Sequence, residues 1–567
     1  MTKKSGIGWL PIAGVTALVV LGGGYFAFRS WLGKTLTLQE GAKIIPQEAL
    51  LTAFVNTDPK SWSKIKQFGT PQMRQLLEES IEPTLDQQLS SMDKKLLGDA
   101  EDSETPDAPA TEISYIKDIQ PWIGGAMVAL LPTEDRENVA EEPATLIVIG
   151  VKNKLRFANF ARKLQQNDEN NLIESEYQGV IIYESPAEDE QGMNMAILGS
   201  KILVSPERTI LEKAIDTSQG KPSLASQKEW QESLSKQLDL ENPLAKVYIH
   251  DYANLLTQMI ASIPEATSIP ESTLKQLEKV ESFAAGFGID QEGIRFQAVS
   301  KLDPELIPDI EPVSDTITAN FPEDTIALAT GSGISQAWSQ FVKQAQEDDN
   351  FKQALAQGRE LFQSVGFDLD QDIFSWMDGD YAFALIPSRQ GILANFGFGG
   401  VMILETSDRA TSQKTMAKLN NLVQERFAIL AIDTKQIEGK EVTAWEVPQQ
   451  GALVKYSWLD NDSLMIALGG SLLDSVSQTP ETPLVSSKSF KTITGSLPEN
   501  NLGTFYLNME QVVALTNNLP QPQASFITPE ANAILNSFRG IGMTVTMPDA
   551  TTSKAEMIFS LKPYQEN

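Results

Sequence analysis

The chain has 567 residues and a formal net charge of −30, with one histidine and no cysteine. Its apolar content is typical of globular proteins, which excludes a wholly disordered chain, and its length favours more than one domain. The absence of cysteine excludes thiolate catalysis and iron–sulfur ligation. A single histidine excludes histidine-based triads and most zinc sites.

The N-terminal stretch predicts a membrane anchor. Ile7–Phe28 is a run of 22 residues without a charge, and about 20 predominantly apolar residues suffice to cross a bilayer as a helix. A secretory signal has a shorter apolar stretch and a small-residue cleavage site, but Tyr25 occupies the place where a cut after Ala27 would need a small residue. We therefore expect residues 1–34 to form a short tail and an uncleaved transmembrane helix, with a cleaved signal as the alternative.

The orientation of this anchor rests on two observations. Lys3 and Lys4 precede the apolar run, and Arg29, Lys34 and Lys43 follow it, so the flanking charges are nearly balanced. A chain without cysteine avoids stray disulfides in an oxidising compartment. We expect a short cytoplasmic N-terminus and an exported body.

The residues after position 34 form a strongly acidic body. They hold 41 basic and 75 acidic residues. Such a surface repels phosphate backbones and anionic lipid headgroups, so nucleic acid is excluded as a partner.

The second half of the chain repeats the first. Segments match in the same order at an offset of about 254 to 276 residues, which is too long for a solenoid repeat. We predict two homologous domains, 38–303 and 317–563, joined by a Pro- and acid-rich linker at 304–316. Matching pairs include IIPQEALLTAFVN (44–56) with NFPEDTIALATGS (320–332), DIQPWIGGAMVALLP (118–132) with DIFSWMDGDYAFALIP (372–387), and ENPLAKVYIHDY (241–252) with ENNLGTFYLNME (499–510).

Within each copy the pattern is α+β. Short apolar runs bounded by Gly, Pro, Asn or Asp predict strands, and the segment 289–296, with a turn at Gly293, predicts a hairpin. We therefore expect two tandem domains with mainly antiparallel sheets and flanking helices. The acidic stretches 98–112, 133–142 and 185–192 are predicted to be loops. Helices are predicted at 60–82, 154–166, 207–216, 251–262, 336–363, 408–424, 471–478 and 508–518.

Few residues are candidates for catalysis. His250 aligns with Asn508 in the second copy, which favours a structural role. Ser61 and Lys64, like Ser272 and Lys275, have the S-x-x-K spacing of a serine–lysine nucleophile, but the companion S-D-N and K-T-G elements are missing. We expect Ser61 to begin an amphipathic helix instead.

Asp368, Asp370 and Asp372 have the alternate spacing of a Ca²⁺ loop. That loop also requires Gly at its sixth and Glu at its twelfth position, where this chain has Ile373 and Gly379. The two copies share only a D-I-x-x-W-x-x-G skeleton, which we interpret as packing. The sequence therefore assigns no catalytic, cofactor-binding or metal-binding residue. The skeleton consists of Asp118, Trp122 and Gly125 in the first copy and of Asp372, Trp376 and Gly379 in the second.

Four features together resemble a family of membrane-anchored cyanobacterial proteins of unknown function. They are the single anchor, the elements that begin at Pro46 and Pro322, the D-I-x-x-W-x-x-G blocks, and the K-x-W/F elements at 228–230 and 488–490 that precede E-N-x-L. The resemblance covers nearly the whole exported body and implies no catalytic residues. It implies a location on the periplasmic side of the plasma membrane or in the thylakoid lumen.

Three functions are compatible with these features. The first is a membrane-tethered, non-enzymatic binding or scaffold protein, suggested by the anchor and the missing catalytic set. The second is a carrier or chaperone for an apolar ligand such as a lipid or a pigment, because strands such as NFGFGGVMIL (395–404) are apolar on both faces. The third is a serine–lysine hydrolase that would use Ser61 and Lys64.

Overall fold

The computed structural model divides into two compact units. The first comprises Met1–Asp303 together with Pro563–Asn567, and the second comprises Pro304–Lys562. The predicted anchor Ile7–Phe28 lies outside the described residues, and no helix within them combines the length and apolar content needed to cross a bilayer. The structure describes residues 35–75, 119–132, 143–165, 173–184, 193–261, 271–307, 311–346, 348–437, 439–469, 472–473, 480–518 and 528–565.

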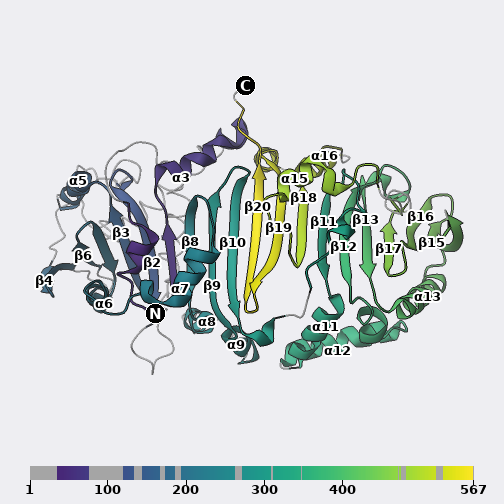
Figure 1. The fold of residues 1–567 in the computed structure, drawn as a ribbon, viewed down its shortest axis with the longest axis horizontal. Helices are drawn as coiled ribbons and strands as arrows, with labels where there is room; N and C mark the ends of the chain where they lie inside the picture. Colours follow the sequence, from purple (N-terminus) through teal and green to yellow (C-terminus); the bar gives the residue numbers. More distant parts are fainter. Residues whose placement is uncertain are drawn as a thin grey trace, which may run out of the picture. The chain divides into compact units, whose positions relative to one another are not determined.

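The described part of the first unit contains an antiparallel sheet of ten strands (Figure 1). The strands lie side by side in the order β4-β5-β6-β7-β3-β2-β1-β8-β9-β10. Their bounds are β1 Leu51–Val55, β2 Ile123–Leu131, β3 Ala144–Val151, β4 Ile173–Tyr177, β5 Val180–Glu184, β6 Asn194–Leu198, β7 Lys201–Ser205, β8 Pro243–Ile249, β9 Val280–Ile289 and β10 Gly293–Leu302.

The second unit repeats this strand order. Its described strands lie in the order β14-β15-β16-β17-β13-β12-β11-β18-β19-β20, so each strand of the first unit has a counterpart numbered ten higher. Their bounds are β11 Ala327–Ser332, β12 Asp380–Pro387, β13 Phe398–Glu405, β14 Ala431–Ile437, β15 Lys440–Val447, β16 Gly451–Trp458, β17 Ser463–Leu468, β18 Gly503–Asn508, β19 Phe538–Asp549 and β20 Thr552–Leu561.

Helices flank both sheets, so the predicted α+β class with mainly antiparallel sheets is confirmed. The predicted hairpin is also present, since β9 and β10 pair through the turn before Gly293. The helices are α2 Leu38–Ala42, α3 Pro59–Ser63, α5 Lys154–Gln165, α6 Arg208–Ser218, α7 Lys228–Gln231, α8 Tyr252–Ala261 and α9 Glu271–Glu278 in the first unit, and α10 Asp315–Thr318, α11 Ile334–Ala345, α12 Asp349–Ser364, α13 Arg409–Arg426, α15 Lys488–Thr494, α16 Met509–Asn518 and α17 Pro529–Leu535 in the second.

Each sheet buries one face in a closed hydrophobic core. In the first unit this core holds Trp230 and Tyr248, both fully buried. In the second it holds Tyr506, fully buried, with the ring of Phe490 packed 5.1 Å away. Both cores are thus built from closely packed, buried apolar side chains.

Equivalent backbone hydrogen bonds recur in the two units. Leu224 N–H donates to Ile45 O, and Leu484 N–H donates to Phe321 O, both at 2.8 Å. The matched sequences thus form the same local contacts.

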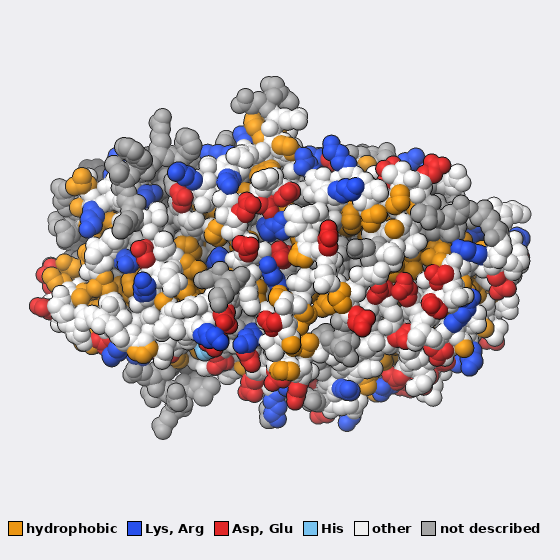
Figure 2. Space-filling model, viewed as in Figure 1, with side chains coloured by type: hydrophobic (Ala, Val, Ile, Leu, Met, Phe, Trp, Pro, Cys, Tyr) orange, Lys and Arg blue, Asp and Glu red, His pale blue; other side chains and the backbone are white. Residues whose placement is uncertain are grey.

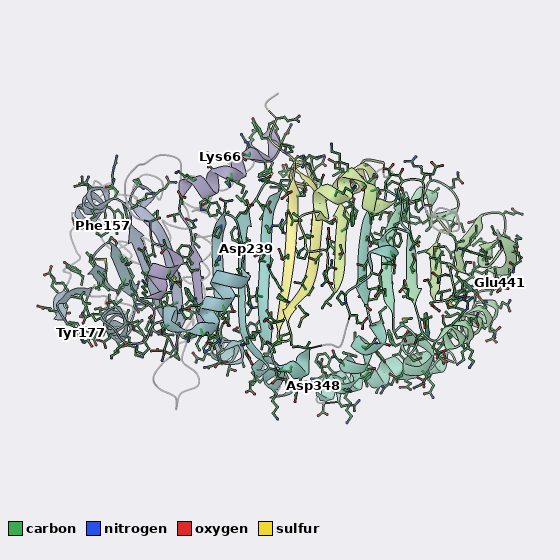
Figure 3. All side chains as sticks on the ribbon, viewed as in Figure 1. Lys66, Phe157, Tyr177, Asp239, Asp348 and Glu441 are labelled. Atoms are coloured by element: carbon green, nitrogen blue, oxygen red, sulfur yellow. The ribbon has the colours of Figure 1, made fainter. Side chains whose placement is uncertain are left out.

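The structure corrects two helix predictions. The predicted helix at 336–363 is two helices, because the Asp348 carboxylate (labelled in Figure 3) accepts hydrogen bonds from Asn350 N and Phe351 N and starts α12 anew. Ser61 does not begin α3. Asp58 is its N-cap, and Pro59 takes the first helical position.

The C-terminal segment returns to the first unit. Phe68 and Pro563 form an antiparallel bridge, and Tyr564 N–H donates to Gln67 O at 2.7 Å. The Arg74 guanidinium lies 3.3 Å from the centre of the Tyr564 ring. The last described residues therefore group with the first unit.

Candidate functional site

His250 has structural contacts. Its backbone N–H donates to Leu50 O at 3.0 Å. Its ring stacks on the ring of Tyr248, and its Nδ1 lies 3.5 Å from the Tyr248 hydroxyl. Asn508 makes the matching backbone bond to Ile326 O, and its side chain accepts from the first amides of α16. Both residues secure the end of a strand, which agrees with the structural interpretation.

The serine–lysine pair is not assembled. The Ser61 hydroxyl accepts a hydrogen bond from Asn56 Nδ2 at 3.2 Å, and among the described residues no hydrogen bond joins Ser61 to Lys64. Ser272 and Lys275 lie on α9.

The aspartates of the Ca²⁺-like segment have protein partners. Asp368 caps the turn Leu369–Phe374. Burial alone would raise the pKa of Asp370, but hydrogen bonds from Arg359 and Trp338 outweigh it and hold that pKa below its usual value. The same balance holds for Asp372, whose counterion is Lys418 at 2.6 Å. Within the described residues, no group of three or more His, Asp or Glu side chains is placed to hold a metal ion.

The shared tryptophan–glycine skeleton packs the sheets. Trp122 and Trp376 are both buried, and Asp118 lies outside the described residues. A Cβ on Gly125, whose φ is +97°, would lie 2.8 Å from Leu36 O, and one on Gly379 would lie 2.9 Å from Glu405 O. Both glycines are required by close backbone approach.

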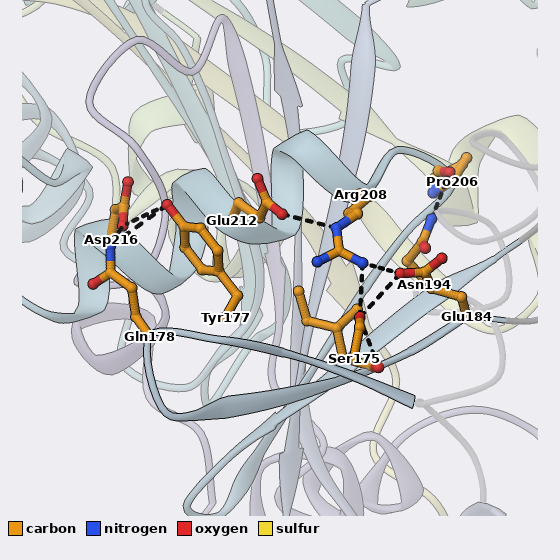
Figure 4. A network of polar contacts seen from close by, with 10 residues as sticks. Ser175, Tyr177, Gln178, Glu184, Asn194, Pro206, Arg208, Glu212 and Asp216 are labelled. Carbon is orange, nitrogen blue, oxygen red and sulfur yellow. Dashed lines mark hydrogen bonds and ion pairs between the residues drawn. The ribbon is translucent and has the colours of Figure 1, made fainter. Parts of the chain in front are cut away.

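A polar network in the first unit ties the edge hairpin β4–β5 to α6 (Figure 4). Arg208 bonds Glu212 on its own helix, Ser175 of β4 and Glu184 of β5. One helical turn after Glu212, the Asp216 carboxylate accepts hydrogen bonds from the Tyr177 hydroxyl and the Lys221 ammonium. The hydrogen bond from Lys221 lowers the pKa of Asp216. All these groups are satisfied within the unit, so we assign the network to holding the hairpin.

The second unit has an apolar groove on the sheet face opposite its core. The groove has a volume of about 450 Å³. Large side chains stand exposed around it, with 42% of Phe383, 41% of Leu385 and 47% of Leu468 accessible to solvent. It is lined by Ala327, Leu328, Ala329, Phe383, Ala384, Leu385, Gly400, Val401, Met402, Ile466, Leu468 and Phe505.

Direct cross-strand pairs place the lining side chains in two rows. Phe505, Ala329, Phe383, Met402 and Ile466 are successive partners across β18, β11, β12, β13 and β17. Ala327, Leu385, Gly400 and Leu468 form the next row. Because directly opposed residues in an antiparallel sheet share a face, the small residues form the floor and the large ones form the walls.

Among the described helices of the second unit, α13 covers one end of this face. Trp376, Leu404, Leu464 and Met416 of α13 form a separate buried cluster there. Met402 and Ile466 of the groove lining pack against this cluster. Its lining includes no charged, hydroxyl or amide side chain. Hydrophobic side chains also reach the viewed surface in several separate areas, while acidic side chains alternate with basic ones (Figure 2).

The sequence indicated part of this groove. The run 395–404, apolar on both faces, contributes Gly400, Val401 and Met402 to it. Phe383 and Phe505 were missed. The signal was the alternation in DYAFALIP (380–387), in which small residues face the core while Tyr381, Phe383 and Leu385 point to the other face.

These features define an α+β protein whose candidate site is an apolar groove on the second sheet. The chain matches a family described as "Protein of unknown function (DUF3352)" over residues 10–561, and it belongs to that family. Comparison with curated proteins gives no match.

Solved structures of a protein called TP0453 resemble part of the chain. Crystal form III is 10% identical over 46% of this chain and 79% of that chain, with a TM-score of 0.25. Crystal form I is 8% identical over 48% of this chain and 80% of that chain, with a TM-score of 0.23.

Proposed function

We propose that the protein is a membrane-tethered, non-enzymatic binding protein and that the groove of the second unit binds an apolar partner. The exposed side chains of Phe383, Leu385 and Phe505 on central strands carry this proposal. Contiguous exposed apolar surface of this kind marks interaction or ligand sites in soluble domains. A groove of several hundred Å³ with apolar walls has the size and chemistry of a small-ligand site.

The tether in this proposal is the apolar segment Ile7–Phe28. Its length suits a single transmembrane helix, and the cysteine-free body suits the exported side of the membrane. The resemblance to membrane-anchored cyanobacterial proteins supports the periplasm or the thylakoid lumen as the location.

We also propose that the two units descend from one duplicated domain. Their identical strand order and the equivalent bonds at Ile45 and Phe321 support this origin. On this proposal, the binding site arose in the second copy when one face of its sheet became exposed to solvent.

Photolabelling tests the binding function. The full chain is reconstituted in phosphatidylcholine vesicles that contain an uncharged, photoreactive hydrocarbon, and labelled peptides are mapped by mass spectrometry. We expect label on peptides of β12 and β18, and little on those of β2 and β8. Phe383→Asp places a charge in the groove and should lower the β12 and β18 label about tenfold.

The matched control is Phe351→Asp on α12, whose ring is also exposed but lies outside the groove lining. This variant should retain the wild-type label. Equal labelling of β12 and β2 in the wild-type chain, or full labelling in Phe383→Asp, would contradict the proposed function.

A further inference from the structure

We infer that the occupant of the groove is a single hydrocarbon chain of a lipid with an uncharged or zwitterionic headgroup. This inference rests on the proposed function, because it concerns the same groove. It is carried by the width of the groove, by the pairing of its strands and by the charge of the chain.

The floor of the groove is a trough along β11. Ala327 and Ala329 are its two outward residues within the groove lining. Tyr381 lies across Gly331 and closes that end, since a Cβ on Gly331 would collide with the tyrosine hydroxyl. With a rise of about 3.3 Å per residue, Ala327 and Ala329 lie about 7 Å apart along this floor.

The walls stand on the two strands that flank β11. Phe505 of β18 and Phe383 of β12 are both direct partners of Ala329. Strands two places apart in a sheet are separated by about 9.5 Å, and the aromatic side chains narrow this gap further. An α-helix with side chains is about 10–12 Å wide, so a partner helix does not enter the trough, whereas an extended alkyl chain does.

An extended peptide is excluded by hydrogen bonding. β11 is paired on both sides, with β12 and β18, so its backbone groups are already used. A peptide strand in the trough would bury N–H and C=O groups without partners, which is costly. A hydrocarbon chain has no such groups.

Charge selects among lipids. The lining is uncharged, and the chain beyond residue 34 carries 75 acidic against 41 basic residues. An anionic headgroup at the mouth of the groove would be repelled by this field, whereas an uncharged or zwitterionic headgroup would not.

Filling the trough separates this inference from the proposed function. Ala329→Leu adds bulk between Phe383 and Phe505 but leaves the face apolar. The full chain is reconstituted in phosphatidylcholine vesicles containing phosphatidylcholine with a photoreactive group on its acyl chain. We expect Ala329→Leu to lower labelling of β12 and β18 about tenfold, and Ala431→Leu, at an exposed alanine of β14, to leave it unchanged.

Each other outcome has a defined meaning. If Phe383→Asp abolishes labelling but Ala329→Leu does not, the groove binds a broad apolar surface, such as a partner helix lying over it, and the trough inference is wrong. If neither variant changes labelling, the proposed function fails as well. If phosphatidylglycerol carrying the same acyl chain labels the groove as well as phosphatidylcholine does, the headgroup assignment is overturned.

Discussion

The two units share a strand order but differ on the second face of the sheet. In the first unit, Val128 and Leu130 of β2 are 4% and 3% exposed. Their counterparts on β12, Phe383 and Leu385, are 42% and 41% exposed. The same topology therefore supports a closed face in one unit and an open apolar face in the other.

The helix after β8 or β18 explains part of this difference. In the first unit, Leu255 and Tyr252 of α8 pack with Leu130 and Ile249. The alignment that matches Tyr248 with Tyr506 places Val513 and Glu510 of α16 at these positions. Glu510 pairs with Lys562 at 3.6 Å instead of packing on the sheet. A smaller residue and a charged one replace two large apolar side chains, so the site depends on side-chain choice and not on topology.

The largest expected effect tests the sheet face that is buried in the hydrophobic core of both units. Trp230→Ala removes a fully buried side chain and should destabilise the first unit by about 3–5 kcal/mol. Phe490→Ala, at the matching half-buried position, should cost the second unit less. Urea unfolding of the full chain, with hydrogen exchange read separately on peptides of each unit, measures both. Equal losses would show that the two cores are packed alike.

The second test addresses the face on which they differ. Leu130→Ala should cost about 2–5 kcal/mol, because Leu130 is buried. Leu385→Ala should cost less than about 1 kcal/mol, because Leu385 already contacts solvent. Hydrogen exchange on β2 and β12 peptides reports each change. A similar loss at the two positions would contradict the open face.

A third substitution tests the close contact between Gly125 and the Leu36 backbone in the shared tryptophan–glycine skeleton. Gly125→Ala combines a positive φ with a close contact to Leu36 O and should cost about 1–3 kcal/mol. Gly179→Ala is the control, since Gly179 also has a positive φ (+77°) but no atom lies within 4 Å of an added Cβ, so it should cost less. Urea denaturation compares the two, and a Gly125→Ala chain as stable as wild type would remove the structural reason for this glycine.

The smallest effect concerns charge. Burial, followed by repulsion from Asp380, Asp460 and Asp462, raises the pKa of Glu405. Its charged form is therefore destabilising above its unfolded-state pKa, and this cost disappears as the pH falls and the group takes up a proton. Glu405→Gln should stabilise the second unit by about 0.5 kcal/mol at pH 7 and have no effect near pH 4. Urea unfolding at both pH values measures this change in the free energy of unfolding. A variant less stable than wild type at pH 7 would contradict the prediction.

The sequence predicted the fold class from local patterns. Alternating strands and the hairpin at Gly293 are set by neighbouring residues, so they could be read directly. The break between α11 and α12 was missed because Asp348 caps a new helix. In the sequence, an aspartate within a helical pattern can either lie on the exposed face of one long helix or cap a second helix, and the pattern alone does not distinguish the two. The groove depends on Phe505, Ala329 and Phe383, which are far apart in the chain and meet only through strand pairing.

The return of Pro563 and Tyr564 to the first unit has a mechanical consequence. The second unit, Pro304–Lys562, is enclosed in sequence between two parts of the first. Tension applied between the N-terminal side of the body and its C-terminal side therefore loads the bridge between Phe68 and Pro563 before it reaches the second unit. While the bridge between Phe68 and Pro563 holds, the strands that line the groove carry no stretching force.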